Sequence, residues 1–119
     1  MRVRGLTFVG TSTDAREPMA ALVRDVLGLP SVPVEGSGHD FFALSDGSTF
    51  AIGPSDGAGG DGRTVGFLVD DVDQAAAELR AAGVPTDDEV AVNARYRYAH
   101  FSAPDGHVYE LVEQIEPPG

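Results

Sequence analysis

His100 and Glu110 are the two residues whose chemistry and spacing stand out in this sequence. They lie on either side of Asp105-Gly106, a dipeptide typical of a tight turn between antiparallel strands. Because side chains alternate along a strand, both are expected on one face of the hairpin. An imidazole beside a carboxylate can form an ion pair, grip a ligand from two sides, or act as general acid and base. The alternative is a structural hydrogen bond for His100 and a partly exposed, hydrogen-bonded carboxylate for Glu110.

Aromatic residues form a second candidate group. Tyr96 and Tyr98 share the strand parity of His100, and a phenol offers flat apolar area with a polar tip. Such side chains suit a cavity for a polycyclic or heteroaromatic ligand. The alternative is ordinary sheet packing, which we also expect for one of the neighbours Phe41 and Phe42, because adjacent residues face opposite sides.

Composition limits the function classes. The chain has 119 residues with 8 Lys+Arg and 19 Asp+Glu, a formal net charge of −11, and no cysteine. The charge disfavours nucleic acid, whose binding needs a basic surface, and it also disfavours anionic substrates. The lack of cysteine excludes disulfides, thiolate metal sites and cysteine nucleophiles. The polar first ten residues and the short apolar runs predict a cytoplasmic protein without a membrane partner.

The chain contains one pattern twice. Residues 21–30 (ALVRDVLGLP) and 76–85 (AAELRAAGVP) each end a helical pattern with Gly, an apolar residue and Pro. Residues 41–52 and 100–111 share an Asp-Gly turn between apolar stretches. The repeat predicts two similar modules, each with a strand, a helix and three further strands.

Helices are predicted at 14–27, opened by an Asp-x-x-Glu capping pattern, and at 71–82. The strands of the first module are predicted at 4–11, 32–35, 40–45 and 48–53, and those of the second at 63–70, 89–93, 95–102 and 107–114. Between the modules, residues 53–62 include five glycines, which is typical of a linker and lacks the Lys-Ser/Thr ending of a phosphate loop.

Two βαβββ modules in tandem resemble the vicinal oxygen chelate superfamily, which includes glyoxalase I, extradiol dioxygenases and bleomycin-binding proteins. The residues that carry the resemblance are PDGHVYEL at 104–111 and VLG at 26–28. Ala103 departs from the usual closing motif, and Leu22-Val23 replaces an aromatic pair in the first helix. The resemblance implies an α+β fold with a curved mixed sheet around a ligand cavity. We expect a single domain over 1–119, with module one at 1–53, a linker at 54–62 and module two at 63–116.

In that superfamily, four equivalent positions hold a divalent metal through His or Glu side chains. Here the resemblance places these positions at Thr7, Ala51, Thr64 and Glu110. Threonine hydroxyls are weak donors and alanine provides none, so we expect no metal and no other cofactor. The small side chains also predict a widened cavity floor. A metal site with displaced ligands, built from His39, His100 and Glu110, is the least favoured alternative.

Period-two alternation then predicts which side chains line the concave face of the sheet. Leu6 and Phe8 are expected to pack beneath the helices instead. The predicted ligand-binding residues are Thr7, Val9, Phe41, Ala51, Thr64, Gly66, Leu68, Tyr96, Tyr98, His100, Glu110 and Val112.

The leading interpretation is a metal-free protein that binds and sequesters a hydrophobic, aromatic or cationic natural product, as in antibiotic self-resistance. The resemblance also implies a homodimer. The alternative is an enzyme of this fold. In that case Glu110 and His100 act without metal as base and acid in an isomerase, cyclase or hydrolase; a metal-dependent lyase or dioxygenase is less favoured.

Overall fold

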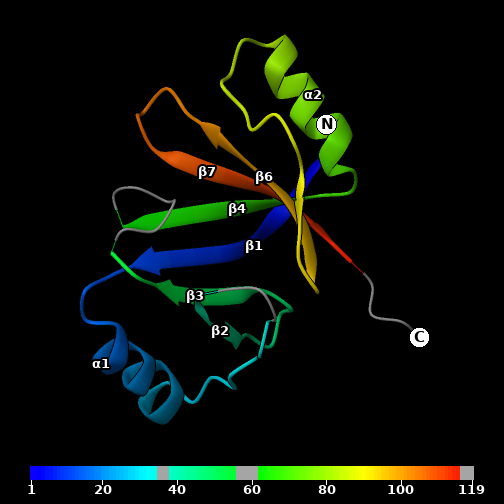
Figure 1. The fold of residues 1–119 in the computed structure, drawn as a ribbon. Coiled ribbons are helices and arrows are strands. Elements are labelled where there is room, and N and C mark those ends of the chain that lie inside the picture. Colours follow the sequence, from blue (N-terminus) through cyan, green and yellow to red (C-terminus); the bar gives the residue numbers. More distant parts are fainter. Residues whose placement is uncertain (35–37, 56–61, 116–119) are drawn as a thin grey trace.

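The structure is a computed structural model, and it describes residues 1–34, 38–55 and 62–115. Figure 1 shows a single curled sheet with a helix near each end. Along the chain the elements are β1 (Val3–Ser12), α1 (Arg16–Ala21), a π-helical turn (Leu22–Val26), β2 (Asp40–Ala43), β3 (Thr49–Gly53), β4 (Arg63–Val69), α2 (Val72–Ala81), β5 (Ala91–Val92), β6 (Tyr96–Ser102) and β7 (Val108–Gln114).

The seven strands form one mixed sheet in the order β2-β3-β1-β4-β7-β6-β5. Within each half, the last strand runs parallel to the first and pairs antiparallel with the strand before it. The two halves meet where β1 and β4 pair antiparallel at the centre of the sheet. The predicted α+β fold with a curved mixed sheet is therefore confirmed.

Both helices cover the same face of the sheet, which we call the helix-bearing face. Under α1 and its π-helical extension, Val23 packs with Phe42 and Ile52. Under α2, Val72 and the alanines of the helix pack on Val69, Ala99 and Leu111. The opposite face of the sheet is concave, and neither helix packs on it.

The two helices begin differently. Asp71 caps α2 by accepting a hydrogen bond from the Gln74 backbone N–H, which favours a helix start at this residue. The Asp-x-x-Glu capping pattern predicted for the first helix does not form. That helix begins two residues later, at Arg16, where the Thr13 hydroxyl accepts from the Ala15 N–H.

Two predicted strands differ from the structure. Of the expected strand at 32–35, residue 35 lies outside the described residues and residues 32–34 are not a strand; only a bridge between Ser31 and Phe42 forms here, because Pro33 has no N–H to continue the ladder. The strand expected at 89–93 is only Ala91–Val92. Most of the predicted linker, residues 56–61, lies outside the described residues. In the described part of the chain, no helix is long and apolar enough to cross a membrane.

Candidate functional site

One end of the concave face is closed by side chains. The Tyr96 hydroxyl on β6 shares a hydrogen bond with the Thr49 hydroxyl on β3, and both residues are buried. Three strands lie between β3 and β6, so their separation in a flat sheet is about 19 Å at roughly 4.8 Å per strand. The hydrogen bond therefore requires strong curling at this end.

A second contact completes the closed end. The Gln114 side-chain amide on β7 donates to the Thr7 hydroxyl at 3.2 Å, and Thr7 is only 3% exposed. Tyr96 is 5% exposed. Thr7 and Tyr96 thus have packing partners here, and the ligand-binding roles predicted for them stay predictions.

A β-bulge in β1 corrects the predicted assignment of faces. Leu6 pairs with Phe67 but Phe8 pairs with Gly66, so one extra residue, Thr7, is accommodated between them. Phe8 therefore faces the concave side with Gly66, whereas Val9, paired with Val65, faces the helix-bearing side. Simple alternation placed Phe8 and Val9 on the wrong faces because an inserted residue reverses parity.

The Phe8 ring covers the space where a hollow floor was expected. Gly10 pairs with both Ala51 and Thr64, and a Cβ at Gly10 would lie 3.0 Å from Phe8 Cε1. The ring also contacts Phe41 at a centroid distance of 6.4 Å. Ala51 and Thr64 are accordingly 0% and 8% exposed, so the floor between them is filled instead of widened.

The four positions equivalent to metal ligands do not form a competent donor set. The Thr7 hydroxyl is bonded to Gln114, Ala51 has no donor, and one Glu110 oxygen is bonded to His100. His39 lies over Gly53 and against Phe41, on the β2–β3 side of the sheet. Among the residues described, no group of three or more His, Cys, Asp or Glu side chains could hold a metal ion. The residues present do not fit a metal centre.

Away from the closed end, three side chains form a connected polar unit. His100 pairs directly with Glu110 across β6 and β7, and His100 Nε2 lies 2.9 Å from Glu110 Oε2. On the other side of the ring, His100 Nδ1 lies 3.1 Å from Asp87 Oδ2. The imidazole is thus held between two carboxylates.

The surroundings raise the pKa of His100 above its ordinary value of 6.5. The hydrogen bond to Glu110 is the largest cause, partly opposed by burial, and the negative charges of Glu110 and Asp87 add to the increase. With one carboxylate at each ring nitrogen, both can donate, which favours the imidazolium. Tyr98 meets the His100 ring edge-on at 5.6 Å. Burial, followed by the charges of Glu110 and Asp87, raises the pKa of Tyr98, so its phenol keeps its proton.

The second oxygen of Glu110 is directed over the centre of the sheet. A Cβ at Gly66 would lie 3.6 Å from Glu110 Oε1 and 2.9 Å from both Phe8 Cβ and Val112 Cγ2. Glycine at position 66 therefore makes room for Phe8 and Val112, and Glu110 Oε1 lies at ordinary contact distance from this position. The Glu110 side chain remains 12% exposed and His100 25% exposed, so this unit is accessible at its edge.

The structure brings together only part of the predicted site. Gly66, Leu68, Tyr98, His100, Glu110 and Val112 share one region of the concave face. Phe41 and Ala51 lie across β1, on the far side of the Phe8 ring. Sequence reasoning missed Asp87 and Phe8. Asp87 opens the acidic run Asp87-Asp88-Glu89, and nothing in that composition indicates that its first residue contacts His100.

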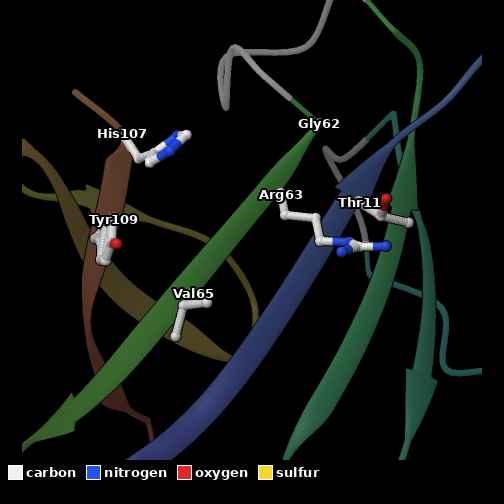
Figure 2. A pocket seen from close by; sticks show the side chains of 6 residues that line it. All are labelled: Thr11, Gly62, Arg63, Val65, His107 and Tyr109. Atoms are coloured by element: carbon white, nitrogen blue, oxygen red, sulfur yellow. The ribbon is translucent and has the colours of Figure 1, made fainter. Parts of the chain in front are cut away.

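A separate groove of about 470 Å³ lies on the helix-bearing face. Figure 2 shows Arg63 and Val65 along β4, with Tyr109 and His107 on the β7 side of them. The complete lining is Thr11, Gly62, Arg63, Val65, His107 and Tyr109. Beside it, Phe67 stacks on Tyr109 and Phe101, and Leu6 is 60% exposed. The homodimer expected from the resemblance stays a prediction.

Comparison with solved structures identifies the fold. Methylmalonyl-CoA epimerase from Mycobacterium tuberculosis aligns with a TM-score of 0.76 and 21% identity over 96% of this chain and 90% of that one. A variant of the Streptomyces coelicolor methylmalonyl-CoA epimerase in complex with 2-nitronate-propionyl-CoA aligns with a TM-score of 0.74 and 22% identity, over 97% of this chain and 100% of that one. A glyoxalase/bleomycin resistance protein/dioxygenase superfamily member from Vibrio splendidus aligns with a TM-score of 0.65 and 16% identity, over 96% of this chain and 100% of that one.

The chain therefore has the fold of the vicinal oxygen chelate, or glyoxalase/bleomycin resistance/dioxygenase, superfamily. The structures similar to it include several methylmalonyl-CoA epimerases. At these identities the likeness concerns the fold alone. No protein-family model and no curated protein sequence matches the chain.

Proposed function

We propose that this protein is a metal-independent isomerase that moves a proton on a small carbonyl compound. The observation that carries the proposal is the contact of His100 Nε2 with Glu110 Oε2 at 2.9 Å, beside a second Glu110 oxygen that projects over Gly66. A carboxylate fixed through one oxygen can use the other as a general base. The pair lies on the concave face and is partly exposed.

In the proposed reaction, Glu110 Oε1 takes a proton from a carbon next to the substrate carbonyl. The electrons of that C–H bond form the enolate, whose negative charge is stabilised by the imidazolium of His100 and by a hydrogen bond from the Tyr98 phenol. Glu110 then returns the proton to another atom of the conjugated system. The substrate loses and regains one proton, so the product is an isomer and no redox partner is consumed.

The structural neighbours support this choice of chemistry. Several proteins with the same fold are epimerases, so isomerisation is an activity that the fold accommodates. The donor set argues for a route through side chains of this chain, because Thr7, Ala51 and Thr64 do not complete a metal site.

Sequestration of an aromatic natural product is the second candidate. The partial exposure of Tyr98 next to Glu110 favours it, since a ring there could stack on a ligand. The burial of Tyr96 and the Phe8 ring over Gly10 leave less flat surface than two exposed tyrosines would.

Proton exchange in D₂O separates the two candidates. Wild-type protein is incubated with a 3-oxoacyl thioester or with methylmalonyl-CoA, and loss of the α-proton signal is followed by ¹H NMR against a protein-free control. We expect catalysed exchange that is lost in Glu110→Gln. Glu89→Gln, an exposed carboxylate with the same change of charge, is the matched control and should exchange at the wild-type rate.

Two results would overturn the isomerase proposal. One is exchange no faster than the protein-free rate across the panel. The other is exchange that survives in Glu110→Gln. Recovery of an unchanged aromatic ligand that raises the melting temperature would support sequestration instead.

A further inference from the structure

We infer that Asp87 is the positioning residue of this site, because its carboxylate fixes the orientation of the His100 ring against Glu110. The contribution of Asp87 to catalysis rests on the proposed function. The effect of Asp87 on the orientation and charge of His100 does not rest on it, and this effect can be measured without a substrate.

The geometry of the contact is specific. A single oxygen, Asp87 Oδ2, accepts from the His100 backbone N–H at 2.9 Å and faces His100 Nδ1 at 3.1 Å. Rotating the ring by 180° would put carbon atoms where both ring nitrogens now lie. Asp87 and Glu110 would then both lose their ring contacts, so the two carboxylates together select one orientation.

Asp87 is itself held by backbone contacts on several sides. Its N–H donates to the His100 carbonyl at 2.9 Å, and the preceding residue, Thr86, bridges to Phe101. The Arg80 guanidinium, near the end of α2, donates to the Asp87 carbonyl and to the Asp88 carbonyl at 3.2 Å. The carboxylate is therefore placed by a loop tied to both β6 and α2, which reduces the entropy lost in orienting it.

The charged groups around His100 explain the effect of this placement. Glu110 faces the ring from β7, Asp87 faces it from the loop after α2, and Tyr98 lies beside it on β6. Hydrogen bonds from the His100 ring to both carboxylates raise the pKa of His100, while burial opposes the increase. A protonated ring can donate to Asp87 and Glu110 simultaneously, whereas a neutral ring has one N–H for two acceptors. Asp87 thus stabilises the form of His100 that anchors Glu110 Oε2 and leaves Oε1 free.

The test is an NMR titration of the histidine ring signals. In the wild type we expect His100 to keep its imidazolium ¹⁵N shifts at pH values above 6.5, the ordinary pKa of the residue. Asp87→Asn keeps the size of the side chain and removes its charge, so it should lower the His100 pKa. Asp88→Asn removes the same charge one residue away, from an exposed side chain, and should leave the titration unchanged. Asp87→Glu should restore part of the shift.

Several outcomes decide the inference. A wild-type His100 whose measured pKa is 6.5 or lower would overturn it, even if Asp87→Asn fails to fold. Equal titrations of His100 in the wild type and Asp87→Asn would also overturn it. If Asp87→Asn lowers the His100 pKa but the wild type exchanges no substrate proton, the positioning role stands and the isomerase proposal fails. If exchange is catalysed with the same pH profile in Asp87→Asn, the positioning role fails and the isomerase proposal stands.

Discussion

Tyr96 and Thr49 lie 47 residues apart in sequence and on strands separated by three others, yet their hydroxyl groups share one buried hydrogen bond. The contact joins the two halves of the sheet across the concave face. It also leaves each hydroxyl dependent on the other, because no water reaches them easily. We therefore expect it to matter for stability more than a typical side-chain hydrogen bond.

Tyr96→Phe tests this contact. The substitution leaves the Thr49 hydroxyl buried without its partner, and the free energy of unfolding should fall by about 1–3 kcal/mol. Urea denaturation monitored by circular dichroism measures the change. Tyr98→Phe is the control, because Tyr98 is half-buried and its hydroxyl forms no hydrogen bond with the described part of the chain; this substitution should cost clearly less. Equal losses in the two variants would contradict the interpretation.

Stability should depend on pH through His100. The pKa of His100 is raised above 6.5 in the folded protein, so the folded state holds its proton more tightly than the unfolded chain. The resulting stabilisation is fully present below pH 6.5 and is lost as the pH rises through the raised pKa. Denaturation midpoints measured from pH 6 to pH 9 should fall with pH, and His100→Gln should remove this part of the slope. His107→Gln should retain the part of the pH dependence of stability that comes from His100.

Gly66→Ala tests the close packing around Glu110. The new Cβ would lie 2.9 Å from Phe8 Cβ and Val112 Cγ2, so something must shift, at a cost of about 1–3 kcal/mol. We also expect a changed His100 titration, because a shift of Val112 would move the neighbouring part of β7 that carries Glu110. Gly38→Ala meets no atom within 4 Å and should leave both properties unchanged. A Gly66→Ala protein as stable as the wild type would show that the concave face has spare room there.

Purified protein should hold no stoichiometric divalent metal. Thr7, Ala51 and Thr64 offer no strong donors, so elemental analysis should find less than one Zn, Fe, Mn or Ni per chain. EDTA should leave both the melting temperature and any proton exchange unchanged. Loss of either on chelation, with recovery on adding back one metal, would contradict our view of the donor set.

Much of the fold could be predicted because local signals agreed with the repeat. The Asp-Gly turns, the Asp71 cap and the helix-ending glycines predicted β3, α2 and β7 closely. Gly28 and Gly83 do adopt the positive φ that a helix end requires, at 74° and 82°. The prediction of a strand at 32–34, the described part of 32–35, was wrong because Pro33 lacks the backbone N–H that a strand needs for pairing.

The site could be predicted only in part. His100 and Glu110 follow from hairpin pairing, which is local in sequence. Asp87 reaches His100 through a loop whose path depends on how α2 docks, and this information is not local. The pattern of residue types gives no sign of the bulge at Thr7. Phe8 and Val9, which follow the bulge in β1, were therefore assigned to the wrong faces of the sheet.

The inserted residue in β1 can be removed without moving the residues that follow it to the other face. Leu6 and Phe8 already pair with Phe67 and Gly66, which are adjacent in β4, so a chain lacking Thr7 would form an unbroken ladder with Phe8 still opposite Gly66. The phenyl ring would stay over Gly10, and the Gln114 amide would lose the hydroxyl that it now contacts. Shortening β1 at this position would therefore leave the concave face as crowded as it is now.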